Sequence, residues 1–246
     1  MSTETRRPWT RDELLLAINF YCKTTFGKMH SRNPEIVDLA GRLGRSPGAL
    51  SYKLANFSSI DPTLDRRGAC NVSKLDRTVW EEFFADWDGM MAESERRMAQ
   101  LMGRKTDEMP ADEPACGGDT MRQTAGMARL TQHVFRKMVL SAYGGSCCIT
   151  GIDHPELLVA SHIIPWAQDE GKRLNPTNGL CLNALHDRAF DRGLISVDAD
   201  YRVMVCRGLD HELIRRYKGQ RITLPQRFLP DPGFLEFHRT QVFVDA

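Results

Sequence analysis

The feature that most constrains the fold is a short strand–loop–helix pattern in the second half of the chain, into which a few polar residues are set. The apolar periodicity predicts strands at Cys147–Thr150 and Leu157–Ile164, a loop at Pro165–Thr177 and a helix at Leu182–Arg192. His162 falls at the end of the second predicted strand, and Asn178 follows the loop. Two strands and a helix around one loop can bring polar side chains to a single point, so this segment is the candidate functional site.

The segment resembles the HNH endonuclease family, which has the ββα-metal fold. The resemblance rests on Ala160-Ser161-His162-Ile163-Ile164-Pro165-Trp166 and on the run from Asn175 to Leu194, framed by Cys147-Cys148-Ile149-Thr150-Gly151 and Phe190-Asp191-Arg192-Gly193. It covers roughly residues 129–246. It implies a metal-dependent nuclease whose products carry 5′-phosphate and 3′-hydroxyl ends.

The residue types suit this chemistry. A neutral imidazole can take a proton from an attacking water near pH 7, which suits His162 as the general base. Asn178 matches the middle asparagine of the family, whose amide binds the loop to the strand and keeps the histidine ring oriented. A divalent cation would neutralise charge on the scissile phosphate and on the leaving oxygen.

Three helix residues are candidate metal ligands. In many relatives an Asp or His precedes the general base, but here that position is Ser161, a weak ligand, so the helix has to supply more. The usual family ligand lies nine residues after the middle asparagine, at Asp187, and Asp191 lies four residues later on the same helix face. His186 is one residue out of this register but is chemically a good ligand. Two of the three are expected to coordinate, and the pair is left open.

The metal follows from the ligands. A set rich in Asp favours Mg²⁺ or Mn²⁺, whereas participation of His186 also admits Zn²⁺ or Ni²⁺. The seven cysteines include no Cys-x-x-Cys pair, which many HNH proteins use for a structural zinc, so we expect buried free thiols. Free thiols and a polar N-terminus without an apolar signal region favour a cytoplasmic protein. No run approaches ~18 apolar residues, so no membrane span is expected.

The first half of the chain predicts a helical domain. Thr10 and Glu13 form a capping-box pattern, and an amphipathic helix is expected from Ser73 through Trp87. Asn33-Pro34 and Ser46-Pro47 begin two short helices separated by a turn at Gly44, a helix-turn-helix-like arrangement. The segment Gly41–Leu54 resembles an N-terminal region fused to bacterial restriction-type HNH endonucleases.

If residues 46–57 form a recognition helix, this region contacts DNA. The candidates for contact with bases are Ser51, Tyr52, Lys53 and Asn56, and Arg42 and Arg45 are the candidates for phosphates. The net charge of +1 does not indicate a nucleic-acid binder, but residues 1–67 contain 11 Lys and Arg against 7 Asp and Glu. The alternative is a packing or dimerisation module with a solvated polar face.

The predicted fold class is α+β, with a helical domain at residues 1–103, an acidic Pro- and Gly-containing linker at 104–128 and the HNH domain at 129–246. The predicted function is a metal-dependent DNA endonuclease of a restriction or defence system. One HNH site cuts one strand, so double-strand cleavage requires a homodimer or two successive nicks. Ser161 keeps open a non-catalytic DNA-binding or regulatory protein with a degenerate HNH domain, and a structural partner in a larger assembly is a third possibility.

Overall fold

The computed structural model describes residues 7–64, 69, 71–103, 119–166, 168 and 170–244, with the side chains of residues 119–130 and 170 outside this description. The chain divides into two compact units, residues 1–22 with 26–108 and residues 23–25 with 109–246. Within the described part of the chain, no helix is both long enough and apolar enough to cross a membrane.

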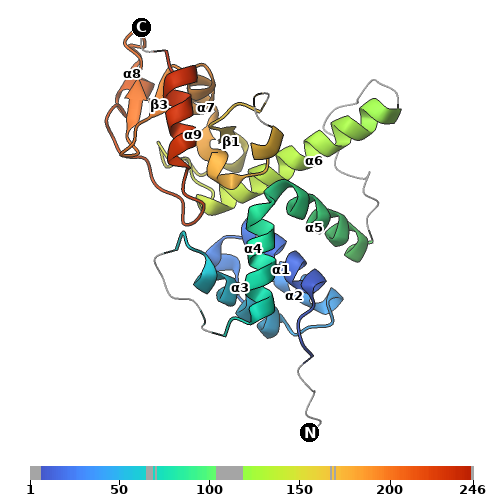
Figure 1. Cartoon of the computed structure of the whole chain (residues 1–246). Helices are drawn as coiled ribbons and strands as arrows, with labels where there is room; N and C mark the ends of the chain where they lie inside the picture. Colours follow the sequence, from blue (N-terminus) through green and yellow to red (C-terminus); the bar gives the residue numbers. More distant parts are fainter. Residues whose placement is uncertain are drawn as a thin grey trace. The chain divides into compact units, whose positions relative to one another are not determined.

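The first unit is helical (Figure 1). Its elements are α1 (Arg11–Lys23), the 3-10 turn η1 (Phe26–Lys28), α2 (Pro34–Arg42), α3 (Pro47–Ile60), α4 (Lys74–Ala85) and α5 (Trp87–Leu101). The predicted helix starts are confirmed, since Asn33 and Ser46 accept hydrogen bonds from the backbone as N-caps of α2 and α3. Gly44, with φ of 62°, ends the preceding helix, as the sequence predicts.

One helix of this unit is divided where the sequence predicts continuity. Ser73 and Asp76 form a capping box at the start of α4, but the expected helix through Trp87 is wrong. Asp86 has non-helical dihedral angles (φ −133°, ψ 74°), ends α4, and accepts a hydrogen bond from the backbone of Gly89 as the N-cap of α5. The aromatic residues expected on one helix therefore lie on both sides of a corner.

The second unit contains two small antiparallel sheets among helices. Its elements are α6 (Asp119–Ala142), η2 (Pro155–Leu157), β1 (Leu158–His162), η3 (Glu170–Lys172), η4 (Pro176–Asn178), β2 (Gly179–Asn183), α7 (Ala184–Asp191), β3 (Ile195–Val197), β4 (Val203–Val205), α8 (Glu212–Arg215), α9 (Pro232–Phe237) and the π-helical η5 (His238–Val242). A helical unit followed by this mixed unit confirms the predicted α+β class.

Three predicted boundaries differ from the structure. Cys147–Thr150 is a tight turn, closed by a 2.9 Å hydrogen bond from the Gly151 nitrogen to the Cys147 oxygen, and is not a strand. The partner of β1 is instead β2, whose residues are all buried, so the residues predicted as the start of a helix are a strand. The long α6 begins at Asp119 rather than Leu130, which makes residues 119–128 of the predicted linker helical; residues 104–118 lie outside the described residues.

The C-terminal segment packs on the end of α7. Gly193 has φ of 67°, and a Cβ there would lie 2.0 Å from the Val242 oxygen. The Val244 nitrogen donates to the Gly193 oxygen at 2.9 Å. The His238 ring stacks on Phe190 of α7, with centroids 3.7 Å apart. Residues 238–244 therefore hold the C-terminal end of α7 in place.

Candidate active site

The β1–β2 hairpin and α7 bring the predicted catalytic segment to one place. In the antiparallel register, His162 lies opposite Gly179 and Leu158 lies opposite Asn183. The chain leaves β1 at His162, passes through the loop, returns as β2, and continues directly into α7. Asn183 ends β2 and caps α7, because its side chain accepts hydrogen bonds from the nitrogens of Leu185 and His186. This continuity fixes the helix relative to the end of β1.

His162 is held on three sides. Its Nε2 lies 3.1 Å from the Arg173 backbone oxygen. Its ring stacks on Phe135 of α6, with centroids 3.7 Å apart and planes 13° apart, and meets Trp166 edge-on at 5.4 Å. Burial lowers the pKa of His162, the hydrogen bond to the Arg173 carbonyl opposes this effect, and the Arg173 charge adds to it. The imidazole is therefore neutral at pH 7.

Asn178 is buried and binds the loop at several points. Its Oδ1 accepts a hydrogen bond from the Ile164 nitrogen at 2.8 Å, and its Nδ2 donates to the Ile164 and Lys172 oxygens at 3.3 Å each. Its backbone oxygen accepts from the Ile163 nitrogen at 2.9 Å. The amide joins Ile164, just after β1, to Lys172 in the loop, and Lys172 is the residue before Arg173. Asn178 thus supports the carbonyl that His162 contacts.

Of the acidic residues of α7, Asp187 lies beside Ser161, and Asp191 lies one turn further along the helix. Burial raises the pKa of Asp187, and the Ser161 hydroxyl and Arg188 partly offset the rise. Burial and the neighbouring Asp187 charge raise the pKa of Asp191, opposed by Arg188 and Arg192. The Ser161 hydroxyl is buried and has no hydrogen bond of good geometry among the described residues. The Ser161 hydroxyl and the Asp187 carboxyl therefore lie close together, with Asp191 as the next carboxyl along α7, and Ser161 directly precedes His162 in β1.

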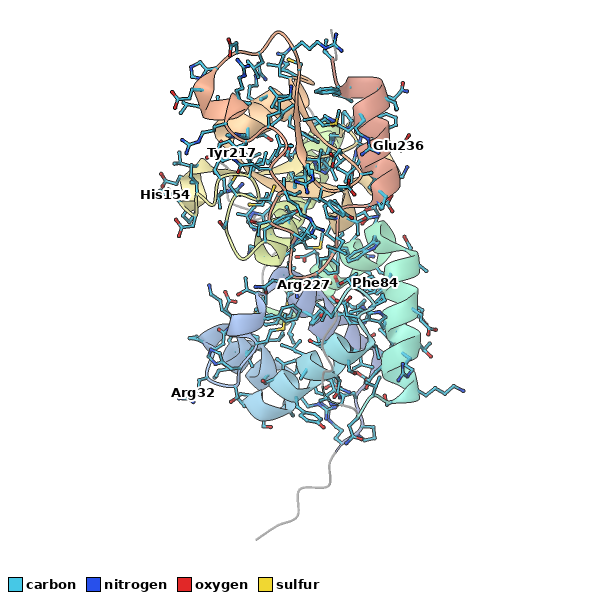
Figure 2. All side chains as sticks on the ribbon, turned by 90° about the vertical axis from the view of Figure 1, so that its left-hand side faces the viewer. Arg32, Phe84, His154, Tyr217, Arg227 and Glu236 are labelled. Carbon is cyan, nitrogen blue, oxygen red and sulfur yellow. The ribbon has the colours of Figure 1, made fainter. Side chains whose placement is uncertain are left out.

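His186 has different surroundings on the same helix. It is 2% exposed, its Nδ1 lies 3.1 Å from the Asn183 Oδ1, and its ring meets Tyr217 edge-on at 5.4 Å. Tyr217, labelled in Figure 2, belongs to the segment that follows α8. The Nε2 of His186 is buried and has no hydrogen-bond partner among the described residues. His186 therefore contacts Asn183 and Tyr217, whereas Asp187 interacts with Ser161 and with Asp191.

The donor atoms at Ser161, Asp187 and Asp191 fit a hard divalent cation. All are oxygens, and a cation would stabilise two carboxylates that burial and mutual repulsion disfavour. Within the described residues, no three His, Cys, Asp or Glu side chains form a ready metal cage. Mg²⁺ does not need one, since it is commonly bound by one or two carboxylates together with waters and substrate phosphates.

The buried thiols of this unit are poorly suited to bind a metal. Cys147, Cys148 and Cys181 are free and buried. Burial raises the pKa of Cys148 well above its ordinary value and raises that of Cys181 to about 12. A thiol ligates zinc as the thiolate, so the raised pKa values of Cys148 and Cys181 fit an apolar core better than a zinc site.

The predicted DNA-contacting residues of the first unit have mostly internal partners. Lys53 is 6% exposed, and its Nζ lies 2.8 Å from Asp76, which is fully buried. Arg45 donates to both carboxylate oxygens of Glu13, at 3.2 and 2.7 Å, and its guanidinium lies 4.5 Å from the centre of the Trp9 ring. These two cations bind side chains of their own unit, and this placement does not favour contact with DNA.

Of the other four candidates, two have internal partners and two lie at the surface. Asn56 is 2% exposed and donates to the Asn71 oxygen, and Ser51 donates to the Met29 oxygen. Arg42 is at the surface, in an ion pair with Asp38 at 3.0 Å. Tyr52 is 45% exposed. Of the predicted set, Tyr52 and Arg42 are the residues that the structure leaves accessible.

Two residues at the site are absent from the predicted set. Arg173 belongs to the loop and contacts His162 through a backbone oxygen, which no side-chain pattern reveals. Phe135 lies on α6, outside the segment that carries the motif. Its place in an apolar helical pattern is visible in the sequence, but nothing there connects it with His162.

A histidine at the end of a hairpin strand, an amide that binds the following loop, and an acidic helix form the strand–strand–helix arrangement of a ββα nuclease site. Residues 147–198 match the family model described as HNH endonuclease. The match confirms the resemblance over residues 147–198 and shows an HNH endonuclease domain there. It does not extend to the first unit, whose resemblance to a fused N-terminal region stays a prediction. No curated protein matches the chain.

Proposed function

We propose that the protein is a metal-dependent DNA endonuclease in which His162 is the general base. The single observation that carries the proposal is the contact between His162 Nε2 and the Arg173 carbonyl oxygen. A carbonyl oxygen can only accept, so Nε2 carries the proton and Nδ1 carries the lone pair. This neutral tautomer can take a proton from water at pH 7.

The other residues hold the reacting groups. Asn178 keeps the loop on β1, so that the Arg173 carbonyl stays in contact with His162. Asp187 and Asp191, with the Ser161 hydroxyl beside them, would hold the divalent cation, and oxygen donors favour Mg²⁺ or Mn²⁺ over Zn²⁺ or Ni²⁺. When bound, the cation supplies charge stabilisation at the scissile phosphate and at the leaving 3′ oxygen.

Two arginines support a nucleic-acid substrate. Arg188 on α7 and Arg192, which follows the last residue of this helix, are exposed, and the charges of both partly offset the rise that burial causes in the pKa of Asp191. Exposed guanidinium groups beside the acidic site can bind phosphates that flank the scissile bond. DNA as the substrate, a restriction or defence role and a cytoplasmic location rest on the sequence resemblance and on the free thiols.

The test is cleavage of supercoiled plasmid, modified and unmodified, by the full-length protein with Mg²⁺, Mn²⁺, Zn²⁺ or Ni²⁺. We expect metal-dependent nicking, and we expect His162→Ala to lower its rate by at least ~10²-fold with an unchanged circular-dichroism spectrum. The exposed His154 serves as the matched control, since His154→Ala should cleave normally. Wild-type rates in a clean His162→Ala preparation would reject the assignment.

The same experiment separates the alternatives. Tight DNA binding without cleavage in any of the four metals would favour the degenerate, regulatory reading. If nicked circles accumulate before linear DNA at every protein concentration, each molecule acts alone on one strand. Linear product that rises with the square of the protein concentration would instead indicate a homodimer.

A further inference from the structure

The His162 ring is covered by an aromatic residue from outside the hairpin. Phe135 of α6 is 1% exposed, and its ring lies nearly parallel to the imidazole, with centroids 3.7 Å apart. The contact joins residues that are far apart in the chain, one in a long helix and one at the end of β1. It leaves the ring face of His162 on that side without access to water.

The opposite strand, β2, has a glycine where the Phe135 ring packs. Gly179 pairs with His162 across the hairpin. A Cβ at Gly179 would lie 2.9 Å from Phe135 Cζ and 2.4 Å from Val139 Cγ2, closer than real Cβ contacts allow. Phe135 and Val139 thus occupy the space that a side chain on β2 would fill. The stack therefore depends on three elements, α6, β1 and β2.

The hydrogen bond at Nε2 leaves one rotation of the imidazole undetermined. A contact at a single ring atom allows the ring to turn about the line between Nε2 and the Arg173 oxygen. The last torsion of a histidine side chain is broad and has no sharp staggered minima, so the side chain alone does not fix this angle. A flat partner at stacking distance removes the freedom, since turning the imidazole would drive its edge into the Phe135 ring.

We propose that Phe135 is a positioning residue for the general base, which fixes the plane of the His162 imidazole and thereby the direction of the lone pair on Nδ1. The inference rests on the proposed function of His162. Its consequence is kinetic, because a misaligned base slows proton transfer without weakening DNA binding. Small displacements of a reacting group can cost up to ~10²-fold in rate.

The test compares two variants of the full-length protein. Phe135→Leu keeps an apolar side chain but removes the flat face, whereas Val139→Ala removes contact with Gly179 one turn further along α6 and leaves the stack in place. Nicking rates are measured as kcat and KM at saturating metal and at a temperature where circular dichroism shows both variants folded. We expect Phe135→Leu to lower kcat by about tenfold or more, with KM within about twofold.

A second readout reports ring geometry without cleavage. Ring protons over the face of a phenyl group resonate upfield in the NMR spectrum, so the carbon-bound protons of His162 should be shifted upfield in wild type and in Val139→Ala. We expect the shift to disappear in Phe135→Leu.

The outcomes distinguish this role from the proposed function. If the shift disappears in Phe135→Leu while kcat stays normal, or if Val139→Ala loses as much kcat, Phe135 is a packing residue and the inference is overturned alone. If wild type shows no cleavage with any metal, the proposed function fails, and the positioning role fails with it.

Discussion

At the scale of single residues, Asp187 is partly buried, and Asp191, one helical turn further along α7, is exposed. We expect Asp187→Asn and Asp191→Asn to lower the nicking rate at limiting Mg²⁺ and to recover part of it at high Mg²⁺, since the loss is in cation binding. Burial raises the pKa of both carboxyls, so their charged forms cost stability when no cation is bound. Thermal unfolding without metal should therefore show the variants at least as stable as wild type.

His186 provides the comparison. Since its ring contacts Asn183 and Tyr217, His186→Ala should lower the melting temperature and leave the metal concentration at half-maximal rate unchanged. If Asp191→Asn instead cleaves normally at limiting metal, Asp191 is a structural residue and His186 with Asp187 holds the cation. His162→Ala should not be rescued by metal in either case.

Substitution of Lys53 tests whether the helix-turn-helix-like pair, α2 and α3, serves packing or contacts DNA. Lys53→Met leaves the Asp76 carboxylate buried without its cation, with the backbone hydrogen bond from Ser73 remaining, and breaking a buried ion pair in this way costs about 3–5 kcal/mol. We expect a large fall in the free energy of unfolding by urea, with no change in the salt dependence of DNA affinity of the protein that remains folded. Tyr52→Ala, on an exposed position of the same helix, should leave stability unchanged.

A lower salt slope for Lys53→Met at unchanged stability would show that Lys53 binds a phosphate. A loss of DNA affinity in Tyr52→Ala alone would show that α3 contacts DNA through its exposed face. The two variants thus separate a packing module from a recognition helix.

The sequence predicts the placement of some of these residues and not of others, for physical reasons. The positions of His162 at the end of a strand and of Asn178 after the loop follow from local order along the chain. The burial of Lys53 does not follow unless helix faces are assigned: it lies three residues after Leu50 and four before Phe57, which places it on the apolar face. Phe135 could not be found, since its contact with His162 depends on how α6 packs against the hairpin.

At the scale of elements, the strand β2 shows why a short apolar run can be mistaken for the start of a helix. Gly179–Asn183 has no alternation of apolar and polar residues, because every residue of the strand is buried. A buried strand of this length cannot be distinguished from a helix segment by periodicity. The helix that follows was correct in type, but its start was assigned two residues too early, at Leu182 rather than Ala184.

The end of α7 gives a prediction at this scale. Gly193→Ala would meet both a positive φ and the Val242 oxygen, so we expect it to displace residues 238–244 and to cost more than about 2 kcal/mol of unfolding free energy. Gly219→Ala is the matched control, because Gly219 has φ of 75° and open space around its Cβ position. Equal losses in urea unfolding for the two variants would mean that backbone strain alone acts, and that the C-terminal contact contributes nothing.

At the scale of the whole molecule, His238 links the fold to pH. It is 1% exposed, lies between the Ser196 hydroxyl and the Phe190 oxygen, and stacks on the Phe190 ring. Burial lowers its pKa from 6.5 to about 4, opposed by the hydrogen bond to Phe190. The folded protein therefore favours the neutral ring.

Because the folded pKa is the lower one, the unfolded chain takes up the proton first as the pH falls. Stability should be complete above pH 6.5, decline between pH 6.5 and about 4, and level off below, with a total loss from this group of roughly 3 kcal/mol. Urea unfolding at pH 7, 6 and 5 measures it. His238→Gln should be less stable at pH 7, with a gap to wild type that narrows towards pH 5; a constant gap would contradict the linkage.

The packing of residues 238–244 on Gly193 also sets an order of events during synthesis. The ribosome makes the motif from His162 to Asp191 about fifty residues before it makes Val244. Until that segment has emerged, α7 has neither the His238 stack nor the hydrogen bond to Val244 at its end. A nascent chain would thus carry Asp187 and Asp191 on a helix whose end is not yet anchored, so the proposed site would be complete only after residues 238–244 have emerged.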